Sequence, residues 1–261
     1  MKLKNLAKTL RFGVGPLGRE REKAAKRKRR EAKFRDDGIW LHEGDIVQRK
    51  YASYQAYVEH QASKLDGIRS RLDDTIEEDY QDFVRRFRDC AVLNEAANVL
   101  CLGARLGTEV RALHALGVFS VGIDLNPGSD NRHVLPGDFH AVAFPDRSVH
   151  AIYTNAMDHV FTIEQFMGEV RRLLVPGGHF VVDMVDGYAE GFTPGDFEAT
   201  AWRDKTVLLE RIAACGGLTE VEVRDLGLLR NERWMQAVFQ LPLDDSGSAS
   251  REVASAARPN A

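Results

Sequence analysis

The sequence is poor in cysteine, and the cysteines it has form no recognisable pattern. Three occur among 261 residues, namely Cys90, Cys101 and Cys215. Their number is odd, they are widely spaced, and no C-x-x-C pair or histidine-rich segment accompanies them. A disulfide framework and a zinc site are therefore not expected. The sequence predicts no metal, and such cysteine usage is typical of a reducing cytoplasm.

Long hydrophobic runs are also missing. No apolar stretch approaches the roughly 18 residues that a membrane-spanning helix needs. Residues 1–17 alternate charged with apolar side chains, whereas a secretion signal has a continuous apolar region. With 44% hydrophobic and 29% charged residues, the chain is expected to be a soluble, cytoplasmic globular protein with one sizeable α/β core.

The most informative segment that is present runs from a strand through a glycine turn into a helix. Residues 99–102 are continuously apolar, as in a strand buried on both faces, and residues 108–116 restore helical periodicity. Between them, Gly103 and Gly107 allow a tight turn, so the N–H groups at the start of the helix face a ligand. A second strand at 119–124 ends at Asp124, which is placed to accept hydrogen bonds from ribose hydroxyls. The expected ligand carries a nucleoside.

The glycine turn and the acid after the second strand are together compatible with several classes of protein. Enzymes that use NAD, enzymes that use S-adenosylmethionine and cofactor-free Rossmann proteins all contain both. The spacing Gly103-x-x-x-Gly107 differs from the G-x-G-x-x-G of dinucleotide-binding proteins, which weakens the case for NAD.

Later motifs narrow the choice. A short strand ends in Gly137-Asp-Phe139, and Phe144-Pro-Asp-Arg-Ser148 precedes a fourth strand that ends near Asn155. An amphipathic helix predicted at 162–174 runs into Val175-Pro-Gly-Gly178, and an apolar strand follows at 179–185. In this order the motifs, over about residues 95–185, resemble the small-molecule branch of the class I S-adenosylmethionine-dependent methyltransferases.

The resemblance implies a fold and a cofactor site. The fold class is α/β, a Rossmann-like three-layer sandwich with a mostly parallel seven-stranded sheet, N-terminal capping helices and a C-terminal antiparallel hairpin. Alternating apolar and polar residues at 219–224 and 233–240 also predict this hairpin. S-adenosyl-L-methionine is the implied cofactor. The implied cofactor residues are Gly103, Ala104, Arg105 and Gly107 at the methionine moiety, Asp124 at the ribose, Leu125 on one adenine face, Asp138 and Phe139 at the adenine edge, and Asn155 on the pocket floor.

Two residues depart from the family pattern. Cys101 stands where the family has an acid, and this puts the usual contact to the methionine amino group in doubt. Arg105 stands where the family has its middle glycine. Its guanidinium either pairs with the methionine carboxylate, in a charge-assisted contact, or points to solvent.

The candidate catalytic residues follow the fourth strand. Asp158 and His159 lie at its carboxyl end, where open sheets bind ligands. An imidazole has a suitable pKa to act as a base for a hydroxyl nucleophile. The alternative is that His159 packs over the cofactor or binds a backbone carbonyl. Thr162-x-x-Gln165 predicts a capping box that would hold the preceding turn, and His140 is expected to be structural.

Charge divides the chain into regions. Residues 1–37 carry 14 Lys/Arg and 5 Asp/Glu, a net charge of +9, and Leu3, Leu6 and Leu10 recur there at helical spacing. This basic N-terminal arm is predicted to be either an amphipathic helix that contacts an anionic membrane or nucleic acid, or a solvated disordered segment. The other predicted regions are a helical cap at 38–94, the cofactor-binding domain at 95–243 with a loop at 186–202, and a disordered tail at 244–261.

The resulting prediction is in-line methyl transfer to a small molecule or to a lipid or glycan intermediate, on a protein peripheral at the membrane. Methylation of nucleic-acid base amines is disfavoured, because Asn155-Ala-Met-Asp158 lacks the Pro-Pro-aromatic run of enzymes with that activity. The alternatives are an RNA methyltransferase of another kind, a cofactor-binding protein with reduced catalysis, and an NAD-dependent oxidoreductase.

Overall fold

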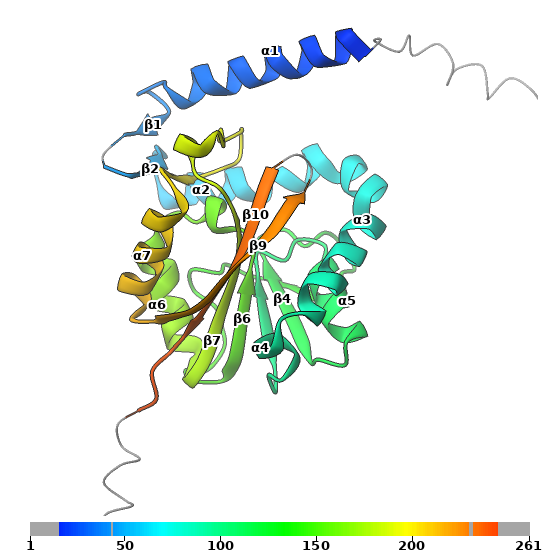
Figure 1. Ribbon diagram of the computed structural model, residues 1–261, viewed down its shortest axis with the longest axis vertical. Helices are drawn as coiled ribbons and strands as arrows, with labels where there is room; N and C mark the ends of the chain where they lie inside the picture. Colours follow the sequence, from blue (N-terminus) through cyan, green and yellow to red (C-terminus); the bar gives the residue numbers. More distant parts are fainter. Residues whose placement is uncertain (1–15, 43, 230–231, 245–261) are drawn as a thin grey trace, which may run out of the picture.

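The computed structural model describes residues 16–42, 44–229 and 232–244. Within this part, the central element is a sheet of seven strands in the order β5-β4-β3-β6-β7-β10-β9 (Figure 1). The strands are β3 (Val99–Leu102), β4 (Ser120–Asp124), β5 (Val134–Pro136), β6 (Val149–Thr154), β7 (Leu174–Val185), β9 (Thr219–Leu229) and β10 (Glu232–Gln240). Neighbouring strands from β5 to β7 are parallel, while β10 is antiparallel to both β7 and β9. The predicted α/β fold with a C-terminal antiparallel hairpin is confirmed.

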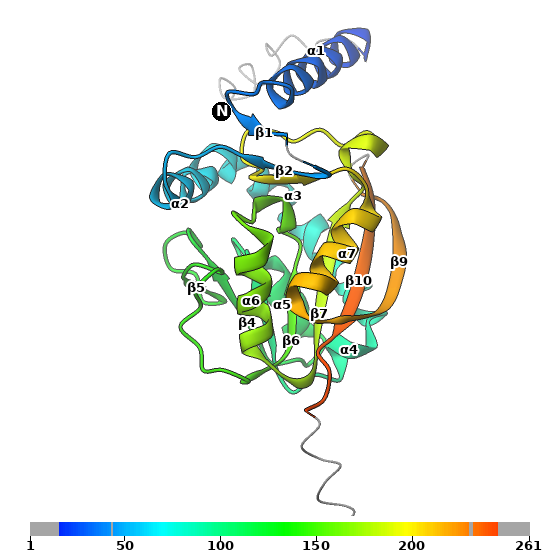
Figure 2. The same ribbon diagram turned by 90° about the vertical axis from the view of Figure 1, so that its left-hand side faces the viewer.

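Helices cover both faces of this sheet and make the three layers (Figure 2). One face carries α3 (Lys64–Arg88), α4 (Ala91–Asn94) and α5 (Thr108–Ala115), and the other carries α6 (Ile163–Leu173) and α7 (Lys205–Gly216). Each of the four residues of β3 is buried, because both faces of a central parallel strand are covered. The apolar run that predicted β3 therefore reflects its position at the centre of the sheet.

A second, three-stranded sheet corrects two predictions. Residues 38–94 are not mainly helical from their start, because β1 (Trp40–Leu41) and β2 (Ile46–Arg49) precede α2 (Tyr54–Ala62). The predicted loop at 186–202 contains a short 3₁₀ helix, η2 (Tyr188–Glu190), and ends in β8 (Thr200–Trp202), which pairs with β2. Trp40, Val47 and Ala201 form a buried cluster there. Pairing between segments about 150 residues apart has no local signature in the sequence.

The described part of the basic arm is a helix, α1 (Pro16–Phe34), which extends beyond the body of the molecule (Figures 1 and 2). This helix covers the second half of the arm and does not decide between the two alternatives, since the amphipathic helix was predicted from residues before it. The stripe of Leu3, Leu6 and Leu10 and the predicted tail from 245 onward lie outside the described residues. Among the helices that are described, none is long and apolar enough to cross a membrane.

The start of α6 differs from its prediction. Thr162 is the N-cap residue, but its side chain makes no capping hydrogen bond, so the predicted capping box is not formed. The helix is held by its buried face, which includes Ile163, Phe166 and Val170. Packing of an amphipathic face is the usual source of helix stability in a folded protein.

Candidate active site

The glycine turn after β3 forms the base of the site. Gly103 and Gly107 both have φ of +75°, in the left-handed region. A Cβ at Gly103 would lie 2.7 Å from the Cβ of Ala156, and one at Gly107 would lie 2.8 Å from Cγ2 of Val134. Conformation and space therefore both require glycine at these positions, and α5 begins directly after the second one.

Asp124 at the end of β4 is oriented by backbone hydrogen bonds. Its Oδ2 accepts from the N–H of Arg105 at 2.8 Å, and its Oδ1 accepts from the N–H of Asn126 at 2.9 Å. Its carboxylate lines a narrow cavity of about 40 Å³, together with Leu125 and Phe139. An acid beside apolar walls at this sheet edge suits a ribose joined to a flat base.

A larger cavity of about 600 Å³ adjoins the narrow one. Gly103, Arg105 and Ala156 line both cavities, as do Lys64 and His159. Of the predicted site residues, Ala104, Asn155 and Asp158 line only the larger cavity. Gly107 and Asp138 line neither of these two cavities. A ligand that bound at Asp124 and extended past the turn would reach the larger cavity.

Asp138 is engaged by side chains of the protein itself. Tyr54 donates to its Oδ2 at 2.5 Å, and the backbone N–H of His140 donates to its Oδ1 at 2.8 Å. Nε2 of His140 accepts from the N–H of Phe161 at 3.1 Å, so Nδ1 carries the proton and donates to Asp138. Burial acts to raise the pKa of Asp138, but these hydrogen bonds outweigh it and the pKa is lowered. His140 thus has a structural role, as predicted.

The candidate catalytic residues lie on a 3₁₀ turn after β6, η1 (Met157–His159). Nδ1 of His159 lies 3.1 Å from the carbonyl oxygen of Phe197, and Nε2 contacts Nζ of Lys64. Burial, then the charge of Lys64, lowers the pKa of His159 to about 3. Burial, then the charge of Arg105, lowers the pKa of Lys64 to about 8. His159 is therefore neutral with both nitrogens engaged, which includes the backbone-carbonyl contact that the sequence left open.

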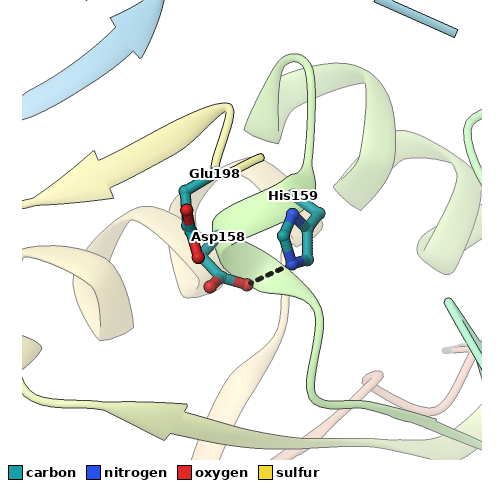
Figure 3. Close-up of side chains that lie close together, drawn as sticks. All are labelled: Asp158, His159 and Glu198. Atoms are coloured by element: carbon teal, nitrogen blue, oxygen red, sulfur yellow. Dashed lines mark ion pairs between the residues drawn. The ribbon is translucent and has the colours of Figure 1, made fainter. Parts of the chain in front are cut away.

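Asp158, His159 and Glu198 converge in the wall of the larger cavity (Figure 3). Their ligand atoms all lie within 4.8 Å of one another, and Oδ1 of Asp158 lies 3.7 Å from Nε2 of His159. Such a donor set could hold a divalent cation. However, the ammonium group of Lys64 already contacts Nε2 of His159, so a metal ion would first have to displace the lysine.

Sequence reasoning missed Lys64, Glu198 and Glu109 as site residues. Lys64 begins α3, about 95 residues before the histidine it contacts, and no motif surrounds it. Glu198 comes from the loop before β8. Glu109 could have been found from the sequence, because it is an acid in the first turn of the helix that follows the glycine turn, close to the predicted cofactor residues.

Comparison with known proteins relates this geometry to one family. Residues 100–182 match the family model described as a methyltransferase domain. The fold is similar to that of 1,6-didemethyltoxoflavin-N1-methyltransferase from Burkholderia thailandensis, with 13% identity over 77% of this chain and 98% of that one and a TM-score of 0.60. It is also similar to an S-adenosylmethionine-dependent methyltransferase from Thermotoga maritima, with 15% identity, coverage of 69% and 98%, and a TM-score of 0.54.

A third similar structure is the methyltransferase in a complex with the Trm112 activator of Haloferax volcanii, with 18% identity, coverage of 70% and 97%, and a TM-score of 0.54. The comparison with curated proteins gave no match. At these identities the structural similarity concerns the fold.

Proposed function

The chain contains a class I S-adenosylmethionine-dependent methyltransferase domain, and from this premise we propose that it methylates a small molecule, or a lipid or glycan intermediate, held in the larger cavity. The observation that carries this proposal is the junction of two unequal cavities at Gly103, Arg105 and Ala156. The larger volume, about 600 Å³, lies within the range of roughly 300–1,000 Å³ that is usual for small-molecule sites.

The residues that line the narrow cavity suit the adenosine part of S-adenosyl-L-methionine in their chemistry, and the cavity of about 40 Å³ would have to widen to admit it. Asp124 offers a carboxylate to ribose hydroxyls, while Leu125 and Phe139 offer apolar surfaces to a base. Asp138 lines neither cavity, and its oxygens accept hydrogen bonds from Tyr54 and His140, so we assign its side chain to holding Phe139 and the cap in position. Any adenine-edge contact would then come from the backbone.

On the methionine side, we assign Gly103, Ala104 and Gly107 to the turn that approaches the cofactor and Arg105 to its carboxylate. We place Asn155 at the floor of the larger cavity. When bound, the cofactor supplies an electrophilic methyl group on its sulfonium. The task of the protein is then to exclude water and to align the acceptor atom with that group.

Asp158 and His159 are proposed to contact the acceptor, since both line the larger cavity beside the shared residues. With Nδ1 held by Phe197 and Nε2 by Lys64, His159 can take a proton only after the lysine moves. We propose that His159 orients the acceptor once Lys64 has moved, because Nε2 is otherwise occupied. Loss of this role would reduce kcat with little effect on cofactor affinity.

Calorimetry and labelled methyl transfer test the proposal. The full chain is titrated with S-adenosylmethionine, S-adenosylhomocysteine and NAD, and we expect micromolar binding of both adenosyl ligands and none of NAD. Methyl-labelled cofactor is then incubated with separated small-molecule, lipid and RNA fractions. Label is expected in one of the first two. Absence of binding by both adenosyl ligands would refute a functional methyltransferase, and label in RNA alone would refute the acceptor class.

A further inference from the structure

Glu109 is a buried carboxylate at the edge of the larger cavity. It is the second residue of α5, directly after the glycine turn, and only 5% of its surface is exposed. It lines the cavity close to Arg105, and the two charges interact. In an α-helix the Cα–Cβ bonds tilt toward the N-terminus, so a side chain in the first turn of α5 leans toward the glycine turn.

Glu109 differs from the other buried carboxylates among the described residues. Glu169 pairs with Arg172 and accepts from the N–H of Val142. Asp183 pairs with Arg86 and accepts from Tyr153 at 2.8 Å and Gln236 at 2.7 Å. For Glu109 the described residues provide no hydrogen bond from another side chain and no ion pair, and its carboxyl group interacts with its own backbone N–H. A buried carboxyl group without a partner is costly, and an incoming cation would lower that cost.

The chemistry of the cofactor supplies such a cation. Its amino-acid moiety carries an ammonium group and a carboxylate on one carbon. On the protein, the guanidinium of Arg105 and the carboxyl group of Glu109 line the same cavity. Cys101, whose buried thiol lies close enough to Glu109 to interact with its charge, offers no carboxylate on β3. We propose that Glu109 binds the ammonium group of the amino-acid moiety, beside Arg105 at its carboxylate. This assignment rests on the proposed function.

Electrostatics agree with this assignment. Burial raises the pKa of Glu109 to about 8, and the charged groups that act on it are Arg105 in the turn, Asp124 on β4 and Arg86 on α3. Near neutral pH the carboxyl group of the free protein is therefore largely protonated. An ammonium group beside it stabilises the ionised form, so ligand binding should release a proton from Glu109.

The test compares two ligands on the full chain at pH 8. S-adenosylhomocysteine carries the amino-acid moiety, and 5′-methylthioadenosine lacks it. Glu109→Gln is expected to weaken S-adenosylhomocysteine about 10- to 100-fold, the usual range for loss of a hydrogen bond between charged groups, and to leave 5′-methylthioadenosine unchanged. The control is Glu78→Gln, an exposed glutamate of α3 that lines the same cavity, and it is expected to bind both ligands normally.

Proton release gives a second measurement. Calorimetry of S-adenosylhomocysteine at pH 7, in buffers of different ionisation enthalpy, should show proton release by the wild-type chain and less by Glu109→Gln. Unchanged affinity and proton release in Glu109→Gln would overturn the assignment. Equal loss of both ligands would also overturn it, because it indicates a defect of the turn. If the wild-type chain bound neither ligand, the proposed function itself would fail.

Discussion

Arg105 has a backbone conformation that is uncommon for a residue with a side chain. Its φ is +45°, and its N–H donates to Asp124. A non-glycine residue in the left-handed region costs on the order of 1 kcal/mol. Glycine would adopt this φ without strain but would remove the guanidinium. Replacing Arg105 by glycine therefore removes the guanidinium charge while the backbone of the turn keeps its conformation.

For Arg105→Gly we expect S-adenosylmethionine to bind about tenfold more weakly, because one charge-assisted contact is lost. Adenosine should bind as in the wild-type chain, since it lacks the methionine carboxylate. Calorimetry with both ligands measures this. Equal weakening of the two would show that the turn is disrupted, and tighter binding would show that the arginine obstructs the site.

Glu109 also makes the stability of the fold depend on pH. Its pKa is raised by burial from 4.5 to about 8, so between these values the folded state keeps a proton that the unfolded state has released. Stability from this group is therefore greatest below pH 4.5 and is lost as pH rises toward 8. Glutamine at this position removes the dependence without changing the size of the side chain.

We expect Glu109→Gln to be more stable than the wild-type chain at pH 8 and about equal to it at pH 5. At pH 7 the difference has an upper bound of about 3 kcal/mol. Denaturant unfolding of both proteins at several pH values measures it. A difference that did not change between pH 5 and pH 8 would mean that Glu109 is not protonated in the folded state.

At the scale of elements, the site depends on how closely β3, its glycine turn and α5 approach their neighbours. Gly107 leads into α5 and lies against His133 and Val134 of the β5 segment, whose side-chain carbons would be 2.9 and 2.8 Å from an added Cβ. The cap contributes from the opposite side, where Tyr57 of α2 donates to the carbonyl oxygen of His159 at 3.0 Å. The proposed cofactor site is thus lined by the sheet edge and by residues of α2 and α3.

Gly107→Ala is expected to destabilise the protein by about 1–3 kcal/mol, because the new methyl group adds backbone strain and contacts two side chains. Cofactor affinity should fall as well. The matched control is Gly168→Ala in α6, where no atom lies within 4 Å of the added Cβ, and alanine there should stabilise the helix by about 0.5–1 kcal/mol. Thermal unfolding of both variants measures this, and comparable stability of the two would contradict it.

At the scale of the whole molecule, α1 places a concentrated positive charge outside the catalytic layers. Lys26, Arg27, Lys28 and Arg29 are exposed on it. The arm is anchored at its base, where Lys33 pairs with Asp196 and Phe34 packs on Trp40. Arg30 lines the larger cavity. We propose that the arm brings the cavity to an anionic membrane surface.

Replacing residues 26–29 by glutamine should reduce binding to anionic liposomes, since each basic residue near such a surface contributes up to about 1 kcal/mol. Cofactor affinity should not change, because none of these side chains lines either cavity. Liposome sedimentation at low and high salt, with neutral lipid and RNA competitor, measures this. Salt-insensitive binding, or preferential retention by RNA, would contradict the membrane proposal.

The central sheet, the glycine turn and the position of Asp124 at the end of a strand could all be predicted from the sequence. These features depend on periodicity and on the conformational freedom of glycine over short segments, and both are visible in a single sequence. The order of short motifs over 95–185 resembles that of the class I S-adenosylmethionine-dependent methyltransferases, and this resemblance implied the cofactor; residues 100–182 match a methyltransferase domain.

The contacts between side chains that are distant in the sequence could be read from the folded structure alone. Lys64 of α3 lines the larger cavity and contacts His159 there, and β2 pairs with β8 although the two strands are about 150 residues apart. Glu109 is buried beside a hydrophobic cluster to which α3, α5 and β3 contribute, and the described residues give it no ion pair. Charge and burial at one position are set by residues distant in the chain. The sequence shows Glu109 as an acid in the first turn of a helix, and only the packing of the chain leaves it buried without an ion pair among the described residues.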